Sequence, residues 1–100
     1  MRKNRVISAG GTLTEIIYAL GKQNNLVAVD QSSMYPQQAT QLPQVGYYRD
    51  LAAEGVLSMR PTTLLALEGA GRSQALKQIE ATGVKLIHYK SLLQLTSYLR

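Results

Sequence analysis

Short apolar runs alternate along the chain with segments whose apolar residues recur at helical spacing. Four of these runs lack strict polar alternation, namely Arg5–Ser8, Leu26–Val29, Thr62–Leu67 and Val84–His88. Runs of this length and kind are typical of strands that are buried on both faces. Because helical segments separate them, the pattern predicts an α/β fold, a parallel Rossmann-like sheet with helices on both faces, in a single domain over residues 1–100.

Local signals place helices between and after the predicted strands. Thr12 and Glu15 have the spacing of a capping box, and Gly21 suits the left-handed residue that follows a helix. Further helices are expected over residues 51–59, 74–81 with Ser73 as its cap, and 91–100. Sheets of this class bind ligands at the carboxyl ends of their strands. The loops expected there cover residues 9–12, 30–36 and 68–73, joined by 45–49 if a short strand precedes that segment.

Composition and charge narrow the possible functions. The 100 residues include no cysteine, which excludes disulfides, thiolate metal sites and cysteine nucleophiles. The net charge is +5, but the chain has no basic helical face and no nucleic-acid-binding motif, so a nucleic-acid partner is not expected. The chain also has no P-loop, carboxylate pair or catalytic histidine constellation, so we do not expect an enzyme. The MRKNR start resembles that of a signal peptide, but no apolar region follows it.

Four stretches of the chain resemble a known family: RVISAGGTLTEIIYALG, VAVDQSSMYP, LPQVGYYRDLAAEGVLSMRPTTLLA and ALKQIEATGVKLI. The family is that of the periplasmic substrate-binding proteins of iron-siderophore, cobalamin and haem ABC importers, and the resemblance is greatest to its haem-binding branch. It covers about residues 5–88. The resemblance implies a binding protein for iron acquisition, located in the periplasm, that delivers ferric haem to an ABC permease in the inner membrane.

The chain departs from that family in two ways. Family members have two lobes that hold the ligand between them, and this chain has the length of the first lobe only. Residues 89–100 are a divergent tail, which suits a truncated fragment. The carboxy-terminal lobe is therefore expected as a missing partner, and binding by the 100-residue chain alone is expected to be weak or absent.

By resemblance, Tyr47, directly after the VG of VGYYRD, ligates the haem iron. Ferric iron is a hard cation, and a phenolate is a hard anionic oxygen donor that is known as an axial haem ligand. A free phenol, with a pKa near about 10, is protonated at neutral pH, but coordination to a cation favours its ionised form. The plainer interpretation is a tyrosine at a strand end, with its ring on the core and its hydroxyl in water.

Arg49 follows two residues later, so in an extended segment its side chain would project on the same side as Tyr47. By resemblance it would hydrogen-bond the phenolate, or it could pair with a haem propionate. Tyr48 is the alternative iron ligand and otherwise a wall of the cleft. Tyr35 and Met34 are expected as further apolar walls of the cleft.

Two other features are assigned roles. Gly10 and Gly11, before a predicted helix, could form part of the cleft wall and receive an anion such as a propionate at the helix N-terminus. Glu54 is expected, by resemblance to the cobalamin-binding members, to form salt bridges with arginines of the permease. His88 is expected to pack in the core or at an edge.

Two alternatives to a haem-binding protein remain. The chain could be a siderophore- or cobalamin-binding member of the family, or a fragment with no independent activity.

Overall fold

The computed structural model describes residues 4–71, 73–89 and 97. Its centre is a four-stranded sheet in the order β2-β1-β3-β4, in which every pairing is parallel. The strands are β1 (Val6–Ala9), β2 (Leu26–Val29), β3 (Thr63–Leu67) and β4 (Lys85–Tyr89). Each strand begins and ends within one residue of the run that predicted it, so the parallel sheet is confirmed.

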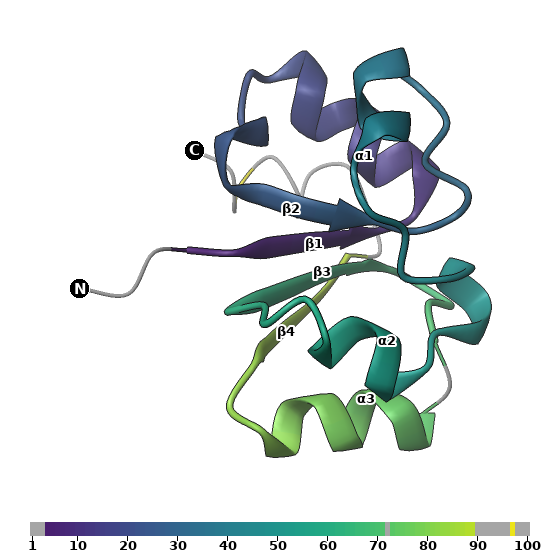
Figure 1. Cartoon of the computed structure of the whole chain (residues 1–100), viewed down its shortest axis with the longest axis vertical. Helices are drawn as coiled ribbons and strands as arrows, with labels where there is room; N and C mark the ends of the chain where they lie inside the picture. The colour runs from purple at the N-terminus through teal and green to yellow at the C-terminus, as the bar shows by residue number, and fades with distance from the viewer. Residues whose placement is uncertain (1–3, 72, 90–96, 98–100) are drawn as a thin grey trace.

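Helices cover both faces of the sheet, as Figure 1 shows. The helix α1 (Gly11–Ala19) lies on one face, and α2 (Ala53–Leu57) and α3 (Ser73–Ala81) lie on the other. The neighbours Leu64 and Leu65 of β3 show the consequence. Successive strand residues point to opposite faces, so Leu64 joins the core beneath α2 and α3 while Leu65 joins the core beneath α1.

Among the described residues, three 3₁₀ segments lie in the connections. They are η1 (Gln23–Asn25), η2 (Gln37–Gln41) and η3 (Tyr48–Asp50). The last two belong to the long connection between β2 and β3, which also contains α2. This connection carries the VGYYRD stretch past the carboxyl ends of the strands before it reaches the opposite face (Figure 1).

Several predicted helix boundaries need correction. The capping box is wrong because Thr12 lies inside α1, which begins at Gly11 with Gly10 in the cap position. The helix predicted over 51–59 is shorter in the structure, and α3 begins at Ser73 rather than after it. The predicted final helix falls almost entirely outside the described residues. Within the described part of the chain, no helix is long and apolar enough to cross a bilayer.

Candidate ligand-binding site

The segment before VGYYRD is fixed to the end of β2. The backbone of Val29 donates to the carbonyl of Pro43 and accepts from the amide of Val45, with both distances at 3.0 Å. One residue pair, Val29 and Gln44, forms a parallel bridge. Beyond it, the amide of Gln31 donates to the carbonyl of Gly46 at 2.6 Å. The segment therefore joins the loops at the carboxyl edge of the sheet, although it forms only an isolated bridge and no further strand.

Asp30, the first residue after β2, lies at the centre of this edge with its side chain fully buried. Its Oδ1 accepts the backbone N–H of Gly10 at 3.0 Å and the hydroxyl of Ser33 at 2.8 Å. Its Oδ2 accepts the backbone N–H of Tyr48 at 2.9 Å and that of Ser32 at 3.1 Å, and the hydroxyl of Ser32 at 2.7 Å. One carboxylate thus connects the loop after β1, the loop after β2 and the turn that carries the tyrosines.

A chain of hydroxyls leads from the sheet to this carboxylate. Thr14 Oγ1 lies 2.6 Å from Ser33 Oγ and 2.8 Å from Ser8 Oγ. A carboxylate only accepts hydrogen bonds and each hydroxyl has a single proton, so the donation to Asp30 fixes the direction of the chain. Ser8 donates to Thr14, Thr14 donates to Ser33, and Ser33 donates to Asp30.

Tyr47 projects from this edge, and its side chain remains 44% exposed. Its backbone is extended, and the 3₁₀ turn η3 begins at the next residue. The ring of Tyr47 meets that of Tyr48 edge to face, with centroids 5.1 Å apart and planes at 68°. Tyr48 is half-buried and packs against the core beneath α2 and α3. Its carbonyl accepts the amide of Gly71, so the loop after β3 also fixes the turn.

Arg49 contacts Tyr48 rather than Tyr47. Its Nε donates to the Tyr48 hydroxyl at 2.8 Å, and its guanidinium carbon lies 5.4 Å from the centroid of the Tyr48 ring. The hydrogen bond to Tyr48 and the electrostatic interactions with the Tyr48 and Tyr47 side chains together raise the pKa of the Arg49 guanidinium above its ordinary value. The expectation of an extended segment is wrong here, because η3 turns Arg49 toward its immediate neighbour.

The two amides of the Gly10–Gly11 turn both have partners within the chain. The N–H of Gly10 donates to Asp30, and the N–H of Gly11 donates to the hydroxyl of Ser32 at 2.9 Å. Gly10 is also buried, and Gly11 is half-buried. The side chains of the next loop therefore use both glycine amides, and a propionate at the N-terminus of this helix stays a prediction.

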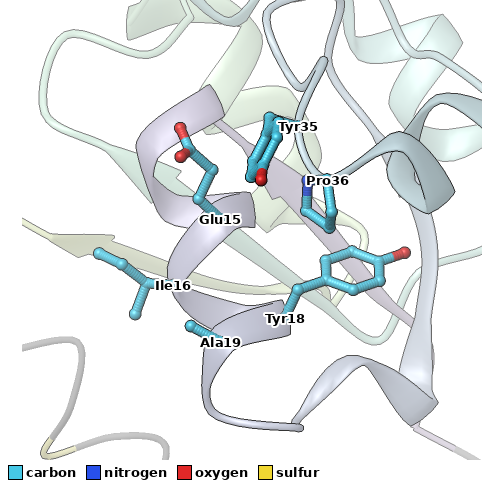
Figure 2. A pocket seen from close by; sticks show the side chains of 6 residues that line it. All are labelled: Glu15, Ile16, Tyr18, Ala19, Tyr35 and Pro36. Carbon is cyan, nitrogen blue, oxygen red and sulfur yellow. The ribbon is translucent and has the colours of Figure 1, made fainter.

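Met34 and Tyr35 present apolar surface beside the end of β2, and the two residues are 71% and 70% exposed. Tyr35 and Pro36 lie over α1, as Figure 2 shows. Together with α1 they line an open cavity of about 400 Å³. The α1 residues that line the cavity are Glu15, Ile16, Tyr18 and Ala19. Tyr35 therefore has one side toward α1 and remains accessible on the other. Met34 is exposed beside it.

Glu54 lies in the first turn of α2, where a carboxylate is favoured by the helix dipole, and its side chain is exposed. It borders a groove of about 350 Å³ between α2 and α3. The other lining residues are Ala52, Ala53, Gln74, Ala75 and Gln78. The Glu54 carboxylate thus lies beside a groove lined by three alanines and two glutamines, on the face of the sheet opposite α1.

His88 is exposed on β4, at the edge of the sheet.

Sequence reasoning missed the role of Asp30. The available signal was local: an aspartate directly after a buried strand and followed by two serines, DQSS, is a pattern that forms side-chain-to-backbone turns. The contacts of Asp30 with Gly10 and Tyr48 span 20 and 18 residues. No local pattern contains them.

Comparison with known proteins agrees with this geometry. A family model described as periplasmic binding protein matches residues 6–99. A vitamin B12-binding protein from Photorhabdus laumondii is 36% identical over 84 residues, which are 84% of this chain and 30% of that protein. A periplasmic heme-binding protein from Pseudomonas aeruginosa superposes with a TM-score of 0.88 at 42% identity, over 96% of this chain and 38% of that one.

A second solved structure is the periplasmic heme-binding protein RhuT from Roseiflexus sp. RS-1, with a TM-score of 0.82 and 44% identity over 87% of this chain and 34% of that one. The chain thus spans about a third of the length of each of these proteins, and its fold corresponds to one lobe, the amino-terminal one, of a two-lobed binding protein. The expected fold class and resemblance are confirmed. Because the family model matches almost its whole length, the chain belongs to the periplasmic binding protein family.

Proposed function

We propose that the chain is the amino-terminal lobe of the substrate-binding component of a haem ABC importer, in which Tyr47 binds the ferric iron of haem as a tyrosinate. The observation that carries this proposal is the position of Tyr47. The residue is 44% exposed at the carboxyl edge of the sheet, on a turn whose next amide is bonded to the buried carboxylate of Asp30. A phenolate oxygen is a hard donor suited to ferric iron.

Neighbouring residues support haem as the substrate class. Porphyrin is a flat apolar ligand with carboxylate substituents, and exposed apolar side chains at Tyr47, Tyr35 and Met34 offer it contact surface. Arg49 is exposed beside them, so its guanidinium can bind a propionate while Nε remains bonded to Tyr48. The solved structures described above at 42% and 44% identity are named for heme binding. Family members are solute-binding proteins, and we propose no catalytic step.

A ligand titration tests the proposal. Hemin and cyanocobalamin are added separately to the two-lobed parent protein and to the 100-residue chain, and absorbance is followed. We expect the parent to bind hemin at least about tenfold more tightly than cyanocobalamin, a difference of about 1.4 kcal/mol, with a shifted Soret band. The chain alone should bind hemin more weakly, because a second lobe supplies the other half of the cleft. An unchanged hemin spectrum with the parent would contradict the proposal.

Cobalamin is the second candidate substrate. The observation that favours it is the curated relatives, which are named vitamin B12-binding proteins and reach 36% identity. A cobalamin carrier would not need a tyrosinate at residue 47 as a metal ligand. In that case the titration gives the opposite order of affinities, with cyanocobalamin the tighter ligand.

We further propose that the protein acts in the periplasm and that Glu54 faces the membrane permease. The support is its exposed carboxylate beside a groove floored by alanines, which can admit the stem of a long cationic side chain. A single exposed ion pair contributes about 0–1 kcal/mol, so its main effect would be on orientation and encounter.

Charge reversal at Glu54 tests this docking role. Glu54→Arg in the two-lobed parent should lower the rate of haem uptake by about 5- to 30-fold, which corresponds to roughly 1–2 kcal/mol from a lost attraction and a new repulsion. Hemin affinity of the purified protein should not change. The matched control is Glu80→Arg, the same charge change at an exposed site on α3. Equal uptake by the two variants would show that Glu54 has no particular role in docking.

A further inference from the structure

We propose that Asp30 is the positioning residue of the ligand-binding edge, and that its carboxylate holds the Tyr47–Tyr48 turn in place over the ends of the strands. Only its effect on haem depends on the proposed function; the positioning itself concerns the ligand-free protein. Asp30 does not touch Tyr47. It acts on the next residue, because the amide of Tyr48 donates to Oδ2 at 2.9 Å.

The three backbone donors explain why a carboxylate is needed at this position. The N–H groups of Gly10, Ser32 and Tyr48 all point at Asp30, one at Oδ1 and two at Oδ2. A backbone N–H cannot reverse its role, whereas a hydroxyl can turn to accept. An amide side chain offers only one oxygen, so in Asp30→Asn at least one of the three backbone donors would face an NH₂ group. Only a group with two acceptor oxygens satisfies all of them.

Because Asp30 is buried, its hydrogen bonds constrain the position of the Tyr47–Tyr48 turn. An unpaired buried carboxylate is strongly unfavourable, and hydrogen bonds to an ionised acceptor are about twice as strong as neutral ones. Asp30 is fully buried and accepts five hydrogen bonds from donors in three separate loops. Displacement of the Tyr48 amide would remove one donor from a buried charge and leave a backbone N–H without its partner.

The position of Tyr47 follows from that constraint. Its own side chain is half exposed, and its ring touches Tyr48 only edge to face. Its backbone, however, lies between two fixed points: the carbonyl of Gly46 is bonded to the Gln31 amide and the amide of Tyr48 is bonded to Asp30. A ligand group held in this way loses little further freedom on binding, which preserves affinity. Asp30 therefore sets how long a Tyr47-bound ligand stays bound.

Two measurements on Asp30→Ala in the two-lobed parent test this inference. The first is amide hydrogen exchange at Tyr48 in the ligand-free protein, which we expect to become at least tenfold faster. The second is the dissociation rate of bound hemin, which we expect to rise at least tenfold with a changed iron absorption spectrum. The matched control is Thr14→Val. It removes the buried hydroxyl bonded to Ser8 and Ser33 but leaves the contact between Asp30 and Tyr48, so both readouts should stay near wild type.

The outcomes separate the two proposals. If hemin does not bind the wild-type protein but exchange at Tyr48 accelerates in Asp30→Ala, the haem proposal fails and the positioning role stands. If exchange at Tyr48 and hemin release both stay within twofold of wild type in Asp30→Ala, or if Thr14→Val accelerates them equally, the positioning role is overturned. Should Asp30→Ala not fold, Asp30→Asn keeps the volume of the side chain. Wild-type protection at all three amides, those of Gly10, Ser32 and Tyr48, would then overturn it.

Discussion

Replacing Tyr47 by phenylalanine should lower the affinity of the two-lobed protein for ferric haem by at least about 100-fold. Partners that only orient a metal ligand already account for 10- to 100-fold in metal affinity, so loss of the ligand atom itself should exceed that range. Phenylalanine keeps the ring and its edge-to-face contact with Tyr48, so the change is confined to the oxygen. Absorbance titration with hemin measures it, and the spectrum should lose its tyrosinate character.

Tyr48→Phe is the matched control for that substitution. It removes the hydroxyl that accepts Arg49 Nε, while the backbone amide of Tyr48 still donates to Asp30. We expect hemin affinity to fall by less than about tenfold, because the lost hydrogen bond joins Tyr48 to an exposed guanidinium and the Tyr47 oxygen is unchanged. If Tyr48→Phe abolished the tyrosinate spectrum and Tyr47→Phe did not, Tyr48 would be the iron ligand.

The strands show most clearly what can be predicted from the sequence. β2, at Leu26–Val29, was predicted at its observed bounds, because a short apolar run between polar segments depends only on burial on both faces. The order of strands and helices then limits the topology, since parallel strands need crossovers and crossovers bring helices to the faces. The carboxyl edge of the sheet, and the loops that gather there, follow from that rule.

The details of the site were not within reach of local patterns. Thr12 and Glu15 fit a capping box, yet α1 begins at Gly11, whose amide is bonded to Ser32, 21 residues away. Arg49 was placed with Tyr47 by strand periodicity, but a 3₁₀ turn directs it to Tyr48. In the first case a contact between distant loops accompanies the helix start, and in the second a local turn, in which the Asp50 amide donates to the Tyr47 carbonyl, replaces the extended conformation. Both corrections adjoin Asp30, which accepts from Ser32 and Tyr48 and was not assigned a role from the sequence.

Gly11 provides a direct test of how rigid this junction is. A Cβ on Gly11 would lie 2.5 Å from the carbonyl oxygen of Ser32, a backbone atom that cannot rotate away. Helix propensity alone would favour alanine over glycine by about 1 kcal/mol. Overpacking costs about 1–3 kcal/mol, and a weakened bond from the Gly11 amide to Ser32 adds about 0.5–1.5 kcal/mol. Gly11→Ala should therefore reduce the free energy of unfolding by about 1–3 kcal/mol, measured by urea denaturation of the chain.

Gly55→Ala is the matched control, because it makes the same change in α2, the helix on the opposite face of the sheet. A Cβ on Gly55 in α2 would lie 3.7 Å from the carbonyl oxygen of Val45, which is ordinary van der Waals contact. Propensity should then decide, and we expect stabilisation by about 0.4–1 kcal/mol. The opposite signs of the two substitutions separate steric contact from helix propensity. If Gly11→Ala had the same free energy of unfolding as wild type, the loop that contains Ser32 would have moved away from the new methyl group at no cost in stability. A loop that moves so readily could not help Asp30 to hold the Tyr47 turn.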